Sequence, residues 1–251
     1  MKTFVISLER SQDRRASVQA LLEREKVKFW FFNAIDIKTD DCNIALKYNA
    51  IKTLRVKGYR LTNAELGCFA SHICLWEKCV ELNEPIFILE DNIQLNDSLH
   101  RYIEYGEKNI EMLGVLKFGA IFDFKFLAID KVLANRSLVK YNKGACGTSS
   151  YMITPLAAKN YLLKSEFFFE PVDNFMDKEW FTGQPLYTLN PSVISRNSSI
   201  STIGSRKDKS KQHFLGKLHA ELYRINVRVR QLVFNMKFNK KVNSIRIGLN
   251  N

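Results

Sequence analysis

Two carboxylates and an amide directly follow an apolar run, and this placement is where the sequence first suggests chemistry. Residues 85–89 predict a buried strand, and Glu90, Asp91 and Asn92 come next. In open α/β sheets, ligands bind beyond the carboxyl ends of the strands. The triplet is therefore either a polar turn that caps local backbone or a rim that holds a cation or the hydroxyls of a sugar nucleotide. The spacing favours neither interpretation over the other.

By the same rule, the polar residues that follow the other predicted strands are also candidates for the site. Apolar runs at 4–8, 29–32 and 117–122 lead into polar residues at 7–10, at 33–36 and at Asp123. We expect these segments to line a site together with the triplet. No P-loop lysine motif is present, and no GxGxxG follows the first strand, which argues against P-loop nucleotidases and dinucleotide oxidoreductases.

Alternating helices and strands must position these residues. Thr62 and Glu65 form a capping-box pair that begins a helix ending near Leu82. Residues 38–60 lack a clear period and are expected to form a loop region with short helical pieces. Further helices are predicted from Ser11 and at 98–112, 155–164 and 172–180, and further strands at 149–153 and 185–189. The alternation predicts an α/β fold with a mostly parallel central sheet covered by helices on both faces.

Positive charge is concentrated at the C-terminal end of the chain. The net charge is +12, and residues 205–251 hold 12 basic but only 2 acidic residues. After a predicted linker at 204–211, a helical pattern carries an apolar stripe: Phe214, Leu215, Leu218, Leu222, Ile225, Val229, Leu232, Val233 and Met236. We expect a single domain over 1–204 and a basic amphipathic helical extension over 205–251.

Three interpretations of this extension stay open. Its stripe packs on the domain, as in an ordinary terminal helix. Alternatively, the stripe lies in a membrane interface, where anionic headgroups attract the basic residues. A nucleic-acid-binding role ranks last, because the segment has few aromatic residues for base stacking and no nucleic-acid motif.

The overall composition excludes several classes of protein. Hydrophobic residues make up 46% and charged residues 25%, which argues against long disorder and disulfide scaffolds. No apolar run approaches the ~20 residues needed to span a bilayer, and Glu9 and Arg10 interrupt the first apolar run before it resembles a signal peptide. The five cysteines are odd in number and form no CxxC pair. We expect a cytoplasmic protein with reduced thiols.

Five segments in order over residues 1–200 resemble glycosyltransferase family 25, the lipopolysaccharide and lipooligosaccharide galactosyltransferase-like proteins. They are Val5–Arg10 with Arg14 and Arg15, Leu61–His72 with Trp76, Ile88–Asn92, Gly147–Ile153 and Pro171–Met176. The resemblance implies a GT-A-like fold and transfer of a hexose from a UDP-sugar to a growing glycan, with inversion at the anomeric carbon. Such a single displacement needs a carboxylate base for the acceptor hydroxyl, and a cation or N–H groups for the departing diphosphate.

The resemblance also implies roles for particular residues. Asp173 is the preferred base and Asp177, one turn later, the second candidate, although Asp173 could instead only cap its helix. Glu65 and His72, which share a helical face, are expected at the sugar or the diphosphate; the alternative is a satisfied helix end and a buried histidine. The other expected donor-binding residues are Ser7, Leu8, Arg10, Arg14, Ala34, Asp36, Glu90, Asp91, Gly147 and Thr148.

The metal motif departs from the family's Glu-Asp-Asp, because its third residue is Asn92. An amide oxygen can ligate Mn²⁺ or Mg²⁺ but brings no charge, so the affinity for the cation should fall. Either Asp91 and Asn92 bind a divalent cation weakly, or basic side chains such as Arg10, Arg14 or Arg196 stabilise the diphosphate. An inactive homologue is the third alternative.

The resemblance implies a bacterial UDP-hexose-dependent transferase. Galactose is the favoured sugar, glucose is the alternative, and the acceptor is a lipid-anchored lipooligosaccharide or lipopolysaccharide. The basic extension would hold the enzyme at the cytoplasmic face of the inner membrane as a peripheral protein. We expect no nucleic-acid partner. The competing hypothesis is a non-catalytic basic adaptor that binds membrane or nucleic acid.

Overall fold

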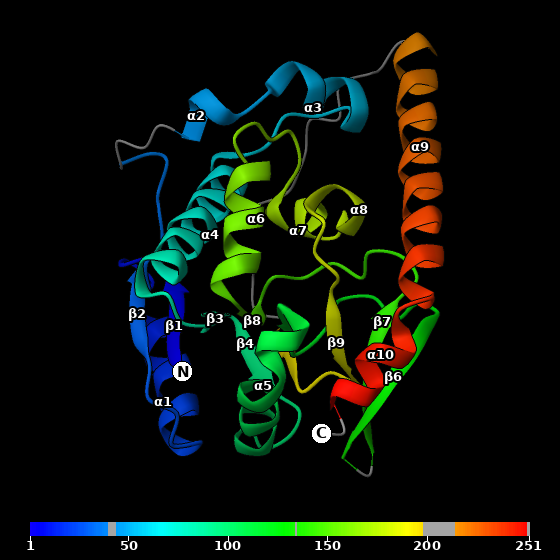
Figure 1. Ribbon diagram of the computed structural model, residues 1–251. Coiled ribbons are helices and arrows are strands. Elements are labelled where there is room, and N and C mark those ends of the chain that lie inside the picture. The colour runs from blue at the N-terminus through cyan, green and yellow to red at the C-terminus, as the bar shows by residue number, and fades with distance from the viewer. Residues whose placement is uncertain (40–43, 134, 198–213, 250–251) are drawn as a thin grey trace.

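A computed structural model describes residues 1–39, 44–133, 135–197 and 214–249 (Figure 1). A central eight-stranded sheet has the order β2-β1-β3-β8-β5-β9-β7-β6. Its strands are β1 (Lys2–Ser7), β2 (Trp30–Asn33), β3 (Ile86–Glu90), β5 (Val115–Lys117), β6 (Phe126–Leu133), β7 (Arg136–Tyr141), β8 (Ser150–Ile153) and β9 (Tyr187–Asn190). The pairings make six of these strands point the same way, with β7 and β8 opposed. The predicted mostly parallel sheet is confirmed.

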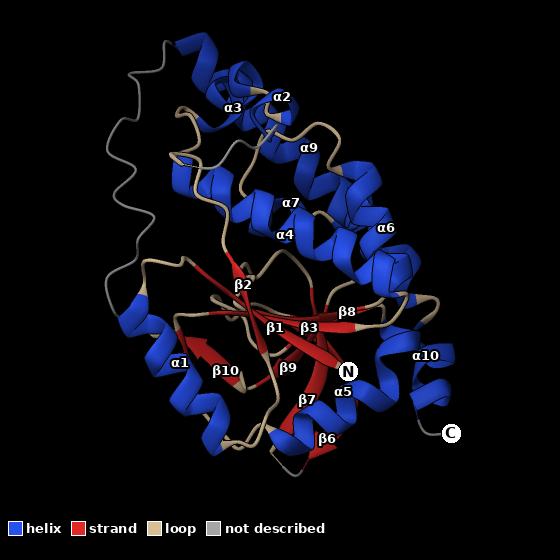
Figure 2. Cartoon of the chain, turned by 90° about the vertical axis from the view of Figure 1, so that its left-hand side faces the viewer, coloured by secondary structure: helices blue, strands red, loops and turns tan. Residues whose placement is uncertain are grey.

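Helices cover both faces of the sheet (Figure 2). They are α1 (Gln12–Arg24), α2 (Ile44–Lys47), α3 (Ala50–Lys57), α4 (Asn63–Leu82), α5 (His100–Leu113), α6 (Pro155–Lys164), α7 (Val172–Met176), α8 (Glu179–Thr182), α9 (Phe214–Asn239) and α10 (Val242–Leu249). Successive side chains of a strand point to opposite faces of the sheet, so the strands contribute to two hydrophobic cores, one on each face. Ile6 belongs to the core that includes side chains of α4, α6 and α7, whereas Val5 belongs to the core that includes side chains of α1, α5 and α10.

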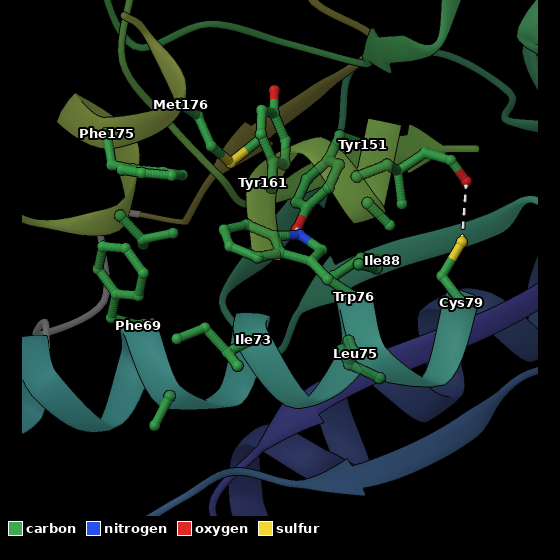
Figure 3. Packing of buried hydrophobic residues seen from close by; sticks show 14 of the residues in the cluster. Phe69, Ile73, Leu75, Trp76, Cys79, Ile88, Tyr151, Tyr161, Phe175 and Met176 are labelled. Atoms are coloured by element: carbon green, nitrogen blue, oxygen red, sulfur yellow. Dashed lines mark hydrogen bonds between the residues drawn. The ribbon is translucent and has the colours of Figure 1, made fainter. Parts of the chain in front are cut away.

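The core under α4 is aromatic and fixes α6 and α7 against the sheet (Figure 3). Trp76 Nε1 donates a 2.9 Å hydrogen bond to the Tyr151 hydroxyl, and both side chains are fully buried. The Phe175 ring of α7 packs at 6.0 Å from Trp76 and 5.9 Å from Tyr161, measured between ring centroids. Because Phe175 is anchored on both sides, the short helix α7 has a defined position over the sheet.

The start of α4 follows the predicted capping box. Thr62 Oγ1 accepts from the Glu65 amide at 3.2 Å, and Glu65 Oε2 accepts from the Thr62 amide at 2.9 Å. Gly67, in the first turns of the helix, lies against the backbone of Ile35, where an added Cβ would overlap the carbonyl oxygen. The glycine therefore lets α4 approach the segment that follows β2.

Two sequence predictions are wrong in detail. The strand expected at 117–122 ends at Lys117, because the Phe118 carbonyl accepts from Val193 and Ile194 and the backbone leaves the sheet. The helix expected at 172–180 is divided into α7 and α8. The β6–β7 hairpin at the sheet edge, and a separate ladder of β4 (Ile93–Leu95) with β10 (Ile194–Arg196), were not predicted.

Helix α9 packs on α3 and α8 through its polar side. Lys140 Nζ donates at 2.8 Å to both Glu179 Oε2 and Asn235 Oδ1, and Gln231 Nε2 donates to the same Glu179 oxygen at 2.6 Å. All four side chains are buried. The boundary predicted between residues 204 and 205, and the linker around it, fall outside the described residues. None of the described helices is both long and apolar enough to cross a bilayer.

Candidate functional site

The first three strands end at one edge of the sheet and form a ledge of polar side chains. Because β1 pairs in parallel with both β2 and β3, the residues after Ser7, Asn33 and Glu90 come together. A solvent-open cavity of about 940 Å³ lies over this ledge and is closed on its far side by the start of α4. From the predicted site, its lining includes Ser7, Leu8, Arg10, Arg14, Ala34, Asp36, Glu90, Asp91 and Asn92.

Asp91 is the centre of the ledge. Its Oδ2 accepts a 2.7 Å hydrogen bond from Ser7 Oγ, and its Oδ1 lies 3.5 Å from Arg14 Nη1. Burial raises the pKa of Asp91, while Ser7 and Arg14 oppose the shift. The carboxylate is thus held in place by the end of β1 and the first turns of α1.

A second ion pair borders the cavity at the end of β2. Arg10, which is exposed, pairs with Asp36, whose pKa is lowered by the hydrogen bond from Arg10. The backbone next to Asp36 is held by Ser71 of α4, whose Oγ accepts a hydrogen bond from the Ile35 amide at 2.9 Å. Arg10 therefore presents a cation at the rim that solvent and an anionic ligand can both reach.

Glu90 connects the ledge to two distant segments. Thr148 Oγ1 donates to Glu90 Oε1 at 2.8 Å, and Arg196 Nη2 lies 3.1 Å from Glu90 Oε2. The charge of Glu90 raises the pKa of Arg196, which stays cationic. Gly147 and Thr148 are therefore next to the ledge, although they do not line the cavity.

A cluster of potential metal ligands borders the cavity. Ligand atoms of Cys68, His72 and Glu90 all lie within 4.8 Å of one another. Burial, followed by Glu90 and Asp173, raises the pKa of the Cys68 thiol well above its usual value. Burial and then the Arg196 charge lower the pKa of His72 to about 3. The Arg196 guanidinium already supplies positive charge to this cluster, which favours the ion pair over a metal here.

His72 is neutral and has a defined environment. Its Nδ1 lies 2.8 Å from the Tyr151 hydroxyl, which also accepts from Trp76. An indole N–H can only donate, so the tyrosine proton is free to point at Nδ1, which leaves the histidine proton on Nε2. Within the described residues, Nε2 is buried without a hydrogen-bond partner. Neither His72 nor Glu65, which is used in its helix cap, lines the cavity.

Asn92 offers a free oxygen to a ligand. Its Oδ1 is buried and has no hydrogen-bond partner in the described part of the chain, whereas its backbone carbonyl accepts from Asn197 at 2.7 Å. A buried acceptor without a partner is costly unless a ligand satisfies it. Asp91 and Asn92 therefore fit a divalent cation as oxygen ligands, although Arg14 already approaches the Asp91 carboxylate.

The two candidate bases have different environments. Asp177 is buried, accepts from the Cys146 amide at 2.8 Å and lies 3.7 Å from Lys117 Nζ. Burial raises its pKa. Asp173 is half-buried and its Oδ1 accepts from the adjacent Asn174 amide. The residue that caps α7 is Pro171, so Asp173 is not the cap residue.

Asp173 lines neither of two neighbouring cavities, but it lies near a lining residue of each. Its charge acts on Cys68, which lines the ledge cavity, and on Cys146, whose pKa is raised to about 12 by burial and then by Asp177 and Asp173. Cys146 lines a second cavity, of about 770 Å³, between α3, α7 and α9. Its basic lining residues are Lys57, Lys143, Lys178, Arg224 and Arg228. Sequence reasoning did not predict this cavity, because α9 supplies one wall from a distant part of the sequence.

The central sheet is covered by helices, and a polar cavity lies at the carboxyl ends of its parallel strands. This combination is typical of ligand-binding α/β proteins, many of which are enzymes. The sequence comparison is more specific. Residues 1–176 match the family described as glycosyltransferase family 25 (LPS biosynthesis protein), and the chain belongs to this family.

Individual relatives are similar at modest identity. The chain is 27% identical over 164 residues, 62% of its length and 60% of the relative's, to a lipooligosaccharide biosynthesis protein of Haemophilus influenzae, lic2B. It is 25% identical over 240 residues, 84% of its length and 82% of the relative's, to the lacto-N-neotetraose biosynthesis glycosyltransferase LgtE of Neisseria gonorrhoeae. It is also 31% identical over 109 residues, 41% of its length and 18% of the relative's, to the mouse inactive glycosyltransferase 25 family member 3.

Proposed function

We propose that this protein is an inverting glycosyltransferase of GT-A-like fold that moves a hexose from a UDP-sugar to a lipooligosaccharide or lipopolysaccharide acceptor. Galactose is the favoured sugar and glucose the alternative. The observation that supports the proposal best is Asp173, a carboxylate that lines neither cavity but whose charge acts on Cys68 at the ledge cavity and on Cys146 at the second cavity. Membership of the family and the similarity to lipooligosaccharide biosynthesis proteins support the same reaction.

The ledge cavity is the proposed donor site. Ser7, Leu8, Ala34 and Asp36 would border the nucleoside, and Arg10 and Arg14 would face the diphosphate. A departing UDP gathers negative charge, which fixed cations stabilise most effectively in a cavity with little water. Arg196 does not line this cavity, but it is paired with Glu90, which does, and it would add positive charge close to the donor.

Asp173 is the proposed base. The acceptor hydroxyl would enter from the second cavity and give its proton to the Asp173 carboxylate. Its oxygen would form the new bond to the anomeric carbon while the bond to the UDP oxygen breaks, and UDP would leave with that electron pair. Asp177 is the weaker candidate, because its carboxylate already accepts the Cys146 amide and faces Lys117.

A divalent cation is proposed as an aid to this reaction. Asp91 and Asn92 would hold Mn²⁺ or Mg²⁺, which would supply charge to the diphosphate when bound. The neutral amide predicts weaker binding than a third carboxylate would give.

Stabilisation by UDP tests the proposal against its alternative, a non-catalytic adaptor. UDP at 100 times its dissociation constant should raise the unfolding free energy by about 2.7 kcal/mol. UMP and ADP serve as matched controls for the second phosphate and the base. A panel of UDP-hexoses with lipooligosaccharide acceptors, read by mass spectrometry, then identifies the donor. An absence of both stabilisation and transfer would support the adaptor or an inactive homologue.

A further inference from the structure

Helix α9 presents its apolar stripe to solvent. Seven large apolar side chains on this helix are between 47% and 67% exposed: Leu218, Leu222, Ile225, Val229, Leu232, Val233 and Met236. At 100° per residue they fall on a single face of the helix. A helix of a water-soluble domain normally buries such a stripe, so its exposure calls for a partner.

The opposite face of α9 is the one that packs on the domain. Among the described side chains of α9, the buried ones are Ala220, Gln231, Asn235 and Phe238. Ala220, Gln231 and Phe238 lie about half a turn from the stripe, and Asn235 lies about a third of a turn from it. Gln231 and Asn235 are fixed by hydrogen bonds to Glu179 and Lys140. These polar contacts fix the rotation of the helix, so the stripe cannot turn inward without breaking a buried network.

Cations border the stripe on both sides. Lys217, Arg224 and Arg228 lie on one flank of the helix and Arg230 and Lys237 on the other, each about 90–130° around the helix from the centre of the stripe, and all five are exposed. Glu221, the acidic residue of this helix, pairs with Arg224. An apolar stripe between two cationic edges is the pattern of a helix that lies in the plane of a lipid surface.

We propose that α9 docks on an anionic lipid surface, with its apolar stripe in the headgroup and acyl boundary and its basic edges on the headgroups. Charge decides against a second copy of the chain as the occupant, because two such faces would bring like charges together. A lipid surface with anionic headgroups complements both the stripe and its edges.

The docked helix would also place the second cavity at the membrane. Arg224 and Arg228, on one flank of the helix, line this cavity together with Asp177. On the proposed function, an acceptor anchored in the bilayer would reach Asp173 without leaving the surface. Docking itself needs no substrate, so a failure of the lipid experiment and a failure of UDP stabilisation are separate results.

Vesicle co-sedimentation of the full chain tests the proposal. Vesicles of phosphatidylethanolamine and phosphatidylglycerol should bind the protein, and pure phosphatidylcholine should bind it at least ~10-fold more weakly. The triple variant Leu222→Glu, Ile225→Glu, Val229→Glu should lose at least ~10-fold in affinity for the anionic vesicles. The matched control is Leu156→Glu with Leu163→Glu on α6, where both leucines are 70% exposed; it should bind as the unchanged protein does.

A second measurement avoids added charge. A tryptophan placed by Ile225→Trp should be quenched by brominated acyl chains, whereas Leu163→Trp on α6 should not. The proposal is overturned if the unchanged protein ignores anionic vesicles, if the triple variant binds them equally, or if both tryptophans respond alike. A dimer in solution that the triple variant dissociates would likewise overturn it and assign the stripe to a second copy.

Discussion

Arg196 Nη2 lies 3.1 Å from Glu90 Oε2, across 106 positions of sequence. The pair joins the end of β3 to β10, and its two side chains are 33% and 13% exposed. The small β4–β10 ladder aligns them, since Arg196 pairs with Ile93 just after the Glu90–Asn92 turn. This ladder brings a cation to the ledge from a segment that sequence spacing would not connect with it.

A double-mutant cycle measures this pair. Arg196→Gln and Glu90→Gln should each weaken UDP binding, since each leaves a partly buried charge without its partner. The double variant should be less impaired than the sum of the two, with a coupling energy of about 1–3 kcal/mol. Isothermal titration with UDP provides the values. Additive effects would mean that the two side chains act independently on the ligand.

Asp173→Asn should impair catalysis without affecting stability, whereas Asp177→Asn should mainly lower stability. Asp173→Asn should lower kcat by about 10²–10⁴-fold through loss of the base, with the melting temperature and the UDP affinity unchanged. Asp177→Asn should instead lower the unfolding free energy by about 3–5 kcal/mol, because Lys117 loses its buried anion. Transfer kinetics and urea unfolding of both variants check this assignment, and a reversed result would make Asp177 the base.

His72 should make stability depend on pH. Burial lowers its pKa from 6.5 to about 3, so between these values the unfolded chain binds a proton that the folded protein does not. The unfolding free energy should therefore rise with pH across this window, and fall by about 1.4 kcal/mol per pH unit below pH 6.5. His72→Gln should remove this slope. Urea unfolding of both proteins at pH 5 to 7 would test it; parallel curves would contradict it.

Gly67→Ala should destabilise the protein although it improves helix propensity. In an exposed helix interior this change would stabilise by about 1 kcal/mol. Here the added Cβ overlaps Ile35 O and would push α4 from the segment after β2, at a cost of about 1–3 kcal/mol. UDP affinity should fall as well, because both segments line the cavity. A raised melting temperature would show that α4 can move without cost.

Asn92→Asp should strengthen the response to Mn²⁺. The Asn92 amide oxygen has no hydrogen-bond partner among the described residues, and a carboxylate in its place adds a charge to the ligand pair. The half-saturating Mn²⁺ concentration should therefore fall by at least ~10-fold. Calorimetric titration of Mn²⁺ and transfer rates at a series of Mn²⁺ concentrations check this. An unchanged response in both measurements would exclude Asn92 as a ligand.

Local patterns predicted the half of the fold that carries the ledge. The apolar runs before Ser7, Asn33 and Glu90 became adjacent parallel strands, and the Thr62–Glu65 capping box began α4 as expected. These features depend on neighbouring residues and on the rule that parallel strands share an edge. Candidate residues at the strand ends, such as Ser7, Asp36 and Asp91, line one cavity for the same reason.

Features set by long-range contacts were not predictable. The run at 117–122 is apolar throughout most of its length, yet its backbone leaves the sheet because Gly119 lies against Ile194, 75 positions later. The side chain of Arg196 gains its role from a ladder that no local pattern indicates. The direction of the α9 stripe depends on Lys140 and Glu179, buried partners in other elements.

The buried network beneath α9 also decides how its role should be studied. Removing residues 205–251 would uncover Lys140 and Glu179, a charged pair that Gln231 and Asn235 now shield from water. A truncated protein could lose its function because it misfolds, because it is insoluble or because it no longer reaches its site of action. The phenotype alone would not distinguish these three causes. Single outward-facing substitutions leave that shield intact, so genetics on this protein should rely on them in place of truncation.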